Sequence, residues 1–181
     1  MSKAPLSGGS ATAVTAPGTA SPCTIGGRGL DAIAVNNANA YWSAAEGLMK
    51  VPVAGGSPTV LAPGSGCASA ITADDANVYW IDSLGRVLKM PVNGGSANAL
   101  TPDVTSGGCI AEDGVNAYWI DGNRGQLMNA PIAGGPPTAA GPHACSLVDF
   151  ALDATSIYWL DEWGGLRGEA ELWKASKETS W

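Results

Sequence analysis

The dipeptide Tyr-Trp occurs four times in this chain and contains all four of its tyrosines. The pairs are Tyr41-Trp42, Tyr79-Trp80, Tyr118-Trp119 and Tyr158-Trp159, at intervals of 38, 39 and 40 residues. Nine positions before each Trp stands an apolar residue, namely Ile33, Ile71, Ile110 and Phe150. Six positions before it stand Asn36, Asp74, Asp113 and Asp153, and two positions after it stand Ala44, Asp82, Asp121 and Asp161. A fixed period of this length predicts a repeat architecture in which each repeat is one supersecondary unit.

A second landmark follows three of the Tyr-Trp pairs. It reads Lys50-Val-Pro-Val-Ala-Gly-Gly, Lys89-Met-Pro-Val-Asn-Gly-Gly and Asn129-Ala-Pro-Ile-Ala-Gly-Gly, and a further copy begins at Lys3. The repeats therefore cover about residues 31–62, 70–101, 109–140 and 149–176, within a single domain of residues 1–181.

The pattern inside one repeat has a period of two, which is typical of strands. In the second repeat, Ala70–Ala73 is small and apolar, Val78–Ile81 is aromatic and β-branched, and Arg86–Met90 alternates polar with apolar residues. Gly94-Gly95 suits a tight hairpin before a weak outer strand at Ala97–Leu100. Four antiparallel strands in about 40 residues predict an all-β fold built from β-propeller blades. A β-solenoid is the alternative, although its coils are usually shorter.

The Tyr-Trp-x-Asp residues, such as Tyr79-Trp80-Ile81-Asp82, resemble the Y-W-T-D repeat of low-density-lipoprotein-receptor propellers. The fuller repeat, with Gly-x-Leu-x-Lys-x-Pro-Val-x-Gly-Gly, resembles propeller-like repeats in uncharacterised proteins of myxobacteria. The resemblance implies the fold over nearly the whole chain and implies nothing about a ligand. Ser43-Ala44 departs from the pattern in the first repeat. Propellers of the Y-W-T-D type also usually have six blades, whereas this chain has four repeats.

The strand count predicts how the ring closes. One outer strand at residues 10–17, three complete repeats and three final strands make four blades of four strands. The N-terminal strand is expected to complete the last blade, which would remove an open sheet edge. A closed four-bladed ring is the first expectation, and half of an eight-bladed two-chain ring or a piece of a longer propeller are the alternatives.

Charge and hydropathy limit the kinds of partner and location that we expect for this protein. The net charge is −7 and the nine Lys and Arg residues are scattered, so a nucleic-acid partner is not expected. No apolar run is long enough to cross a bilayer, and the N-terminus lacks the pattern of a signal peptide. Either the protein is cytosolic or a leader was removed, and the start at Met1 directly before a repeat fragment is compatible with removal.

Four cysteines, Cys23, Cys67, Cys109 and Cys145, lie in or near the loops that enter each innermost strand. Disulfides are the favoured interpretation, with free thiols and a thiolate metal site as alternatives; the pairing is not determined by the sequence. Paired cysteines would indicate a secreted or periplasmic protein. No Cys-x-x-Cys spacing is present, so we expect neither a metal site nor a cofactor.

The remaining candidates for chemistry have structural interpretations. His143 is the only histidine and is expected to be an exposed loop residue without a catalytic partner. The two Asp columns suit turn capping. Trp42, Trp80, Trp119 and Trp159 are expected in the core, and Trp173 and Trp181 are expected to pack the last blade or tail.

The sequence favours a non-enzymatic binding or scaffold protein whose ligand, a carbohydrate or a protein, contacts the loops of one propeller face. The candidate contact residues occupy the turn after each Tyr-Trp strand: Glu46, Arg86, Arg124 and Trp163. Trp163 is the most notable of them because it interrupts the repeat. A structural, engineered or excised repeat protein that assembles with itself is one alternative. A hydrolase or lyase acting at the channel mouth is the other.

Overall fold

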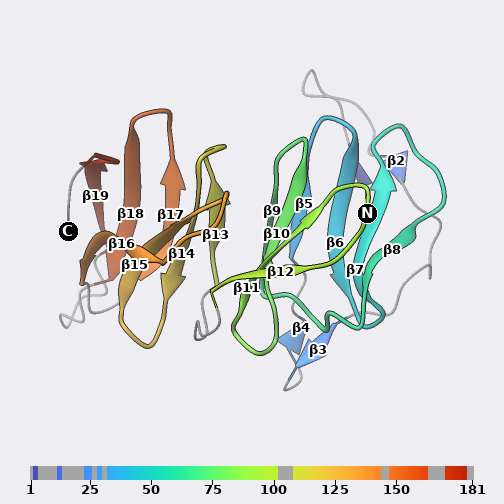
Figure 1. Cartoon of the computed structure of the whole chain (residues 1–181), viewed down its shortest axis with the longest axis horizontal. Helices are drawn as coiled ribbons and strands as arrows, with labels where there is room; N and C mark the ends of the chain where they lie inside the picture. Colours follow the sequence, from blue (N-terminus) through green and yellow to red (C-terminus); the bar gives the residue numbers. More distant parts are fainter. Residues whose placement is uncertain are drawn as a thin grey trace.

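The computed structural model describes residues 2–3, 12–13, 23–25, 28–29, 32–101, 108–143, 147–162 and 170–178. These residues form antiparallel strands joined by turns, and they include no helix that could cross a membrane. Figure 1 shows the main sheets side by side along the long axis of the molecule.

Three sheets contain four strands each, with every strand paired to its neighbour in sequence. The first has β5 (Ile33–Val35), β6 (Asn39–Ala44), β7 (Gly47–Pro52) and β8 (Thr59–Pro63). The second has β9 (Ala70–Ala73), β10 (Asn77–Ile81), β11 (Val87–Pro91) and β12 (Asn98–Thr101). The third has β13 (Ile110–Glu112), β14 (Asn116–Asp121), β15 (Gln126–Pro131) and β16 (Thr138–His143).

The fourth sheet has three strands in the described part of the chain: β17 (Leu147–Leu152), β18 (Ser156–Glu162) and β19 (Ala170–Ser176). Two short hairpins precede the first sheet. They are β1 (Ser2–Lys3) with β2 (Thr12–Ala13), and β3 (Thr24–Ile25) with β4 (Arg28–Gly29).

Local sequence explains where the strands end. The hairpin between the third and fourth strands contains Gly94 and Gly95 at φ values of 92° and 130°, which side chains with a Cβ rarely adopt. Gly47 also has a positive φ, and a Cβ there would meet the carbonyl oxygen of Ala62 in the neighbouring strand. The pairing of third and fourth strands shifts register in all three complete sheets, for example between Val87 and Leu88.

The Tyr and the Trp of each pair lie on opposite faces of their sheet, because successive side chains of a strand point to opposite sides. We call them the Tyr face and the Trp face. The Tyr face of the first sheet packs on the Trp face of the second, where Tyr41 and Leu48 cluster with Trp80. The second packs on the third and the third on the fourth in the same manner. Most of the core therefore lies in three successive interfaces between sheets, while Ala40, Met49 and Val51 are buried on the outer Trp face of the first sheet.

The tryptophan column is buried where such an interface covers it. Trp80, Trp119 and Trp159 are buried, as the sequence predicts for the core. Trp42 is only partly buried, because no four-stranded sheet among the described residues packs on its face of the first sheet. Trp173 is half exposed on β19, and Trp181 lies outside the described residues.

The row of sheets does not close on itself in the part of the chain that the structure describes. Figure 1 shows β5–β8 at one end of the long axis and β17–β19 at the other. The predicted closure by residues 10–17 is not observed either, since Thr12–Ala13 pairs with Ser2–Lys3 rather than with the last sheet. The physical reason is distance: β2 lies at the end of the molecule that carries the first sheet. The other residues of that segment lie outside the described ranges.

Candidate functional site

The Asp column before each Tyr-Trp strand caps a turn. Asp74 Oδ1 accepts hydrogen bonds from the backbone N–H groups of Ala76 and Asn77, both at 2.6 Å, and its Oδ2 accepts the Tyr79 hydroxyl at 2.8 Å. Asp113 and Asp153 repeat this arrangement with Tyr118 and Tyr158. Each such carboxylate accepts at least three hydrogen bonds inside its own sheet, so the structure confirms the turn-capping interpretation of this column.

These carboxylates and the tyrosines that they bind are electrostatically coupled. Burial tends to raise the pKa of Asp113, but hydrogen bonds from Lys177, the backbone and Tyr118 outweigh it and lower that pKa overall. Burial, and then the hydrogen bond to Asp113, raise the pKa of Tyr118 to about 12. The native state therefore favours an ionised Asp beside a protonated Tyr.

The Asp column after the Tyr-Trp strand orders the turn that carries the predicted contact residues. Asp82 is buried, and its Oδ1 accepts backbone N–H groups of Leu84 and Arg86 at 2.9 Å. Its Oδ2 forms an ion pair with the Arg86 guanidinium at 2.6 Å. In the third sheet Asp121 does the same for Asn123 and Arg124, with a looser ion pair of 3.5 Å. The Arg86 guanidinium is therefore already bound to Asp82 of its own turn.

The tips of these turns differ, although the second and third sheets share the Asp anchor that Ala44 replaces in the first. Leu84 is 73% exposed, and Glu46 and Arg124 are also exposed. The turns between β6 and β7, β10 and β11, and β14 and β15 all lie at the lower edge of the sheets in Figure 1. The structure thus brings Glu46, Arg86 and Arg124 to one edge of the molecule, on separate sheets. Trp163 lies outside the described residues, so its role as a contact residue stays a prediction.

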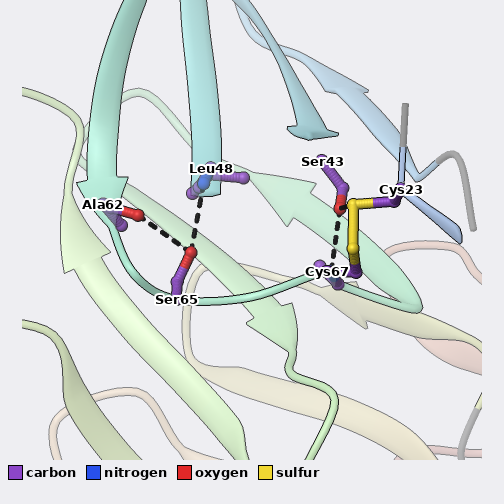
Figure 2. Close-up of a disulfide and its surroundings, with 7 residues drawn as sticks. Cys23, Ser43, Leu48, Ala62, Ser65 and Cys67 are labelled. Atoms are coloured by element: carbon purple, nitrogen blue, oxygen red, sulfur yellow. Dashed lines mark hydrogen bonds between the residues drawn. A yellow bond between two sulfur atoms is a disulfide. The ribbon is translucent and has the colours of Figure 1, made fainter. Parts of the chain in front are cut away.

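Cys23 and Cys67 form a disulfide that ties the segment before the first sheet to the entrance of the second (Figure 2). The Ser43 hydroxyl lies 3.0 Å from Cys23 Sγ and accepts the backbone N–H of Ala68 at 2.8 Å. Ser43 is buried at the position where later repeats carry Ile81 or Ile120. The departure of the first repeat from the pattern is therefore a local adaptation to the disulfide, which sequence reasoning missed.

The other cysteines and the histidine differ in part from the predictions. Cys109 is a free thiol, so the disulfide interpretation is wrong for that residue in this structure. Its Sγ donates to Asp149 Oδ1 at 3.1 Å, and burial together with this carboxylate raises its pKa to about 12. Cys145 lies outside the described residues. His143 is the last residue of β16, opposite Gln126, rather than a loop residue.

Polar side chains also bridge neighbouring sheets. Lys50 Nζ donates to the carbonyl oxygen of Val92 at 2.8 Å, and Lys89 Nζ donates to that of Ile132 at 3.1 Å. Between the third and fourth sheets, Lys177 Nζ lies 2.8 Å from Asp113 Oδ2. The Lys column before the x-Pro pair was visible in the sequence, but nothing there showed that it reaches the next repeat.

No three His, Cys, Asp or Glu side chains gather as a metal site would require within the residues that the structure describes. A shallow apolar pocket of about 180 Å³ lies on the last sheet, where Ala151, Tyr158, Leu160 and Leu172 line it.

Comparison with solved structures supports the architecture. A chain of a nidogen/laminin complex is 22% identical with a TM-score of 0.62, and the match covers 73% of this chain and 56% of that one. The computationally designed Ika4 protein is 14% identical with a TM-score of 0.64 over 90% of this chain and 97% of its own. Tricorn protease matches at 13% identity and a TM-score of 0.65, over 81% of this chain and 15% of its own.

The chain has a β-propeller fold. The predicted fold class of repeated four-stranded antiparallel blades is therefore confirmed. No protein-family profile matches the sequence, and no relative is found among curated proteins. The described sheets are from here on called blades 1 to 4. The candidate site is the set of turns between the second and third strands of the propeller blades.

Proposed function

We propose that this propeller is a non-enzymatic binding or scaffold module that recognises a protein or a glycan through the turns between the second and third strands. The observation that carries the proposal is the combination of a repeated anchor with varied tips. Asp82 and Asp121 fix the turn backbone from a buried position, whereas Leu84 and Arg124 at the tips are exposed. Variable side chains on a rigid frame are typical of binding surfaces.

The distribution of polar groups over blades 2 and 3 also supports a binding role. The carboxylates that could serve as acids or bases in blades 2 and 3 are occupied as turn caps and ion-pair partners. The exposed tips present an apolar group at Leu84, an anion at Glu46 and a cation at Arg124, which also pairs with Asp121 of its own turn. Such a mixed surface suits hydrogen bonding and packing against a folded partner or a sugar.

Glycan-array binding and pairwise titration against candidate proteins test the proposal on the intact chain. We expect the triple variant Glu46→Ala, Leu84→Ala and Arg124→Ala to lose at least about tenfold in affinity, the effect of 1.4 kcal/mol. The matched control is Val115→Ala, an exposed residue in the turn at the opposite edge of blade 3. Unchanged binding by the triple variant together with weakened binding by Val115→Ala would contradict the proposed surface.

We also propose that the repeat is of the Y-W-T-D type found in low-density-lipoprotein-receptor propellers. The support is residue by residue: Tyr79-Trp80-Ile81-Asp82 supplies one buried aromatic for each face and the carboxylate that orders the following turn. A homologous sequence that keeps these four positions while its turn tips vary would strengthen the assignment.

The cysteines support a proposal about the compartment in which the protein functions. A buried Cys23–Cys67 disulfide is stable in an oxidising environment, so we propose that the protein functions outside the cytosol, secreted or periplasmic. Mass spectrometry of the protein purified from its source without reductant would show the Cys23–Cys67 linkage under this proposal and two alkylatable thiols otherwise.

A further inference from the structure

The two end blades expose opposite faces of the same repeated interface. On the Trp face of blade 1, Ile33 is 55% exposed, whereas Ile71 at the equivalent position of blade 2 is 8% exposed beneath blade 1. Val35 is also exposed and Trp42 is partly exposed. Ala40, Met49 and Val51 on the same face are buried, so the uncovered part of this face is its inner-strand half.

Blade 4 exposes the complementary Tyr face. Leu172 is 70% exposed, whereas the equivalent Leu127 of blade 3 is 1% exposed and packs against Trp159 of the following blade. Leu172 and Tyr158 line the shallow pocket on this face. Three internal interfaces join a Tyr face to a Trp face, and in the described part of the chain no blade covers the Trp face of blade 1 or the Tyr face of blade 4.

The strands at the two ends are complementary as well. Blade 4 lacks a fourth strand in the described part of the chain, so β19 is an edge strand. The β1–β2 hairpin pairs Lys3 with Thr12. This register is that of the third and fourth strands of complete blades, where Lys50 pairs with Thr59 and Lys89 pairs with Asn98. The strand β2 therefore has the sequence and register of a fourth strand, and it belongs to no complete blade.

We propose that two copies of this chain associate head to tail, so that the Tyr face of blade 4 in one copy packs on the Trp face of blade 1 in the other. At each seam β2 of one copy leaves its two-residue pairing with β1 and joins β19 of the other copy, with Thr12 opposite Lys174. Each seam thus becomes a complete four-stranded blade, and pairing removes the open edge of β19.

Closure with two copies follows from the blade number. A head-to-tail interface produces either a ring or an open filament. Each of the two chains supplies three complete blades, and each of the two seams supplies one composite blade. The ring would therefore have eight blades, within the usual range of about four to eight for closed propellers. Closure within one chain would need the two ends to meet, whereas they lie at opposite ends of the long axis.

Light scattering on the intact chain tests the association. We expect a mass twice that of the 18.2 kDa chain, independent of further increases in concentration. Leu172→Glu should halve the measured mass, because it places a charge in the apolar interface. Leu84→Glu is the matched control, since Leu84 is equally exposed but lies on a turn, and it should keep the two-chain mass. A parent protein that stays at 18.2 kDa, or a Leu172→Glu variant that keeps twice this mass, would overturn the proposal.

A variant at the other end separates head-to-tail from tail-to-tail pairing. Ile33→Glu should also halve the mass, because each seam uses the Trp face of blade 1. Tail-to-tail pairing would leave that face free, so a two-chain mass for Ile33→Glu combined with a halved mass for Leu172→Glu would refute the head-to-tail arrangement. Mixing the two variants should restore a two-chain species, because one unaltered seam remains between them.

Cysteine cross-linking tests the strand exchange. The double variant Thr12→Cys and Lys174→Cys should form a disulfide between chains and run as two linked chains on a non-reducing gel. The control Lys3→Cys and Thr12→Cys bridges the partners of the β1–β2 hairpin and should run as a single chain when the variants are oxidised at high dilution. A single-chain product from the Thr12–Lys174 variant would overturn the exchange.

Discussion

At the residue scale, the polar groups of this propeller are shared between turn formation and contacts between blades. Asp113 shows both uses: it caps the turn before β14, accepts the Tyr118 hydroxyl at 2.9 Å and pairs with Lys177 of blade 4 at 2.8 Å. Lys177 Nζ also lies 5.7 Å from the centre of the Tyr118 ring. Asp113 thus stabilises blade 3 and joins it to blade 4.

Tyr118 gives a prediction about alkaline pH. Its folded-state pKa is raised to about 12 from an ordinary value near 10, so the stability that it contributes is complete below pH 10 and is lost as the pH rises toward 12. Tyr118→Phe should cost about 1 kcal/mol at pH 7 through the lost hydrogen bond and should reduce the loss of stability above pH 10. Urea unfolding at pH 7, 9 and 11 measures both effects. Equal loss of stability with pH in the two proteins would contradict the assignment.

Cys109 gives a prediction about reactivity. Burial, and then the Asp149 carboxylate, raise its pKa to about 12, and the thiolate is the reactive form. We expect iodoacetamide at pH 8 to alkylate Cys109 at least about 100-fold more slowly in the native protein than in the unfolded chain. Asp149→Asn should accelerate the native reaction. Peptide mapping by mass spectrometry follows this residue alone, and equal native and unfolded rates would disprove the prediction.

At the element scale, the first blade departs from the repeat at the residue after its tryptophan, next to the Cys23–Cys67 disulfide. Later blades place Ile81 or Ile120 after the tryptophan, whereas blade 1 has Ser43, whose hydroxyl contacts Cys23 and the N–H of Ala68. A larger apolar side chain would leave that N–H without its acceptor. The connection between β8 and β9 is consequently held by a covalent bond and by a hydrogen bond that the other connections do not use in the described residues.

Removing the disulfide should destabilise the protein measurably. The bridge spans 44 residues, and a loop of that size corresponds to about 2–4 kcal/mol of stability. We expect Cys67→Ala to lower the melting temperature by several degrees and the parent protein to respond to reductant in the same way. Cys109→Ser is the control, because its hydroxyl keeps a donor for Asp149 and no bridge is lost. An unchanged melting temperature for Cys67→Ala would show that the bridge contributes nothing.

At the scale of the whole molecule, the position of a blade in the row decides how much a repeated residue contributes. Trp119 is 1% exposed because blade 2 covers it, and Trp42 is partly exposed at the free end. The two residues occupy the same column of the repeat, so their difference comes from the neighbouring blade and not from their own strand.

Two alanine substitutions measure how much the buried and the partly exposed tryptophan contribute to the free energy of unfolding. Trp119→Ala should cost about 3–5 kcal/mol, the range for a buried aromatic side chain. Trp42→Ala should cost less than half as much at a protein concentration low enough to keep the chains apart. Chemical unfolding at that concentration gives both values. Equal costs would mean that the end face is covered in solution to the same extent as the interior.

The sequence by itself determined the repeat, the strand pattern, the turn-capping Asp columns and the burial of Trp80, Trp119 and Trp159. The repeat, the strands and the capped turns are local, because they follow from a period of two along each strand and from side chains that bond to their own turns. The burial of the three tryptophans also requires the neighbouring blade that covers each of them. The same information located Glu46, Arg86 and Arg124 in equivalent turns, although only the structure showed that Arg86 is held by Asp82.

The tertiary structure alone decided the rest. Which cysteines meet, where β2 pairs and which faces stay open depend on the angle and spacing between successive blades, and no residue encodes that geometry alone. The count of sixteen strands was compatible with a closed four-bladed ring, but in this structure the ends of the row lie far apart. Small rotations between blades add up along the row. Closure is therefore a property of the assembled molecule, while each blade is already specified by its own 40 residues or so.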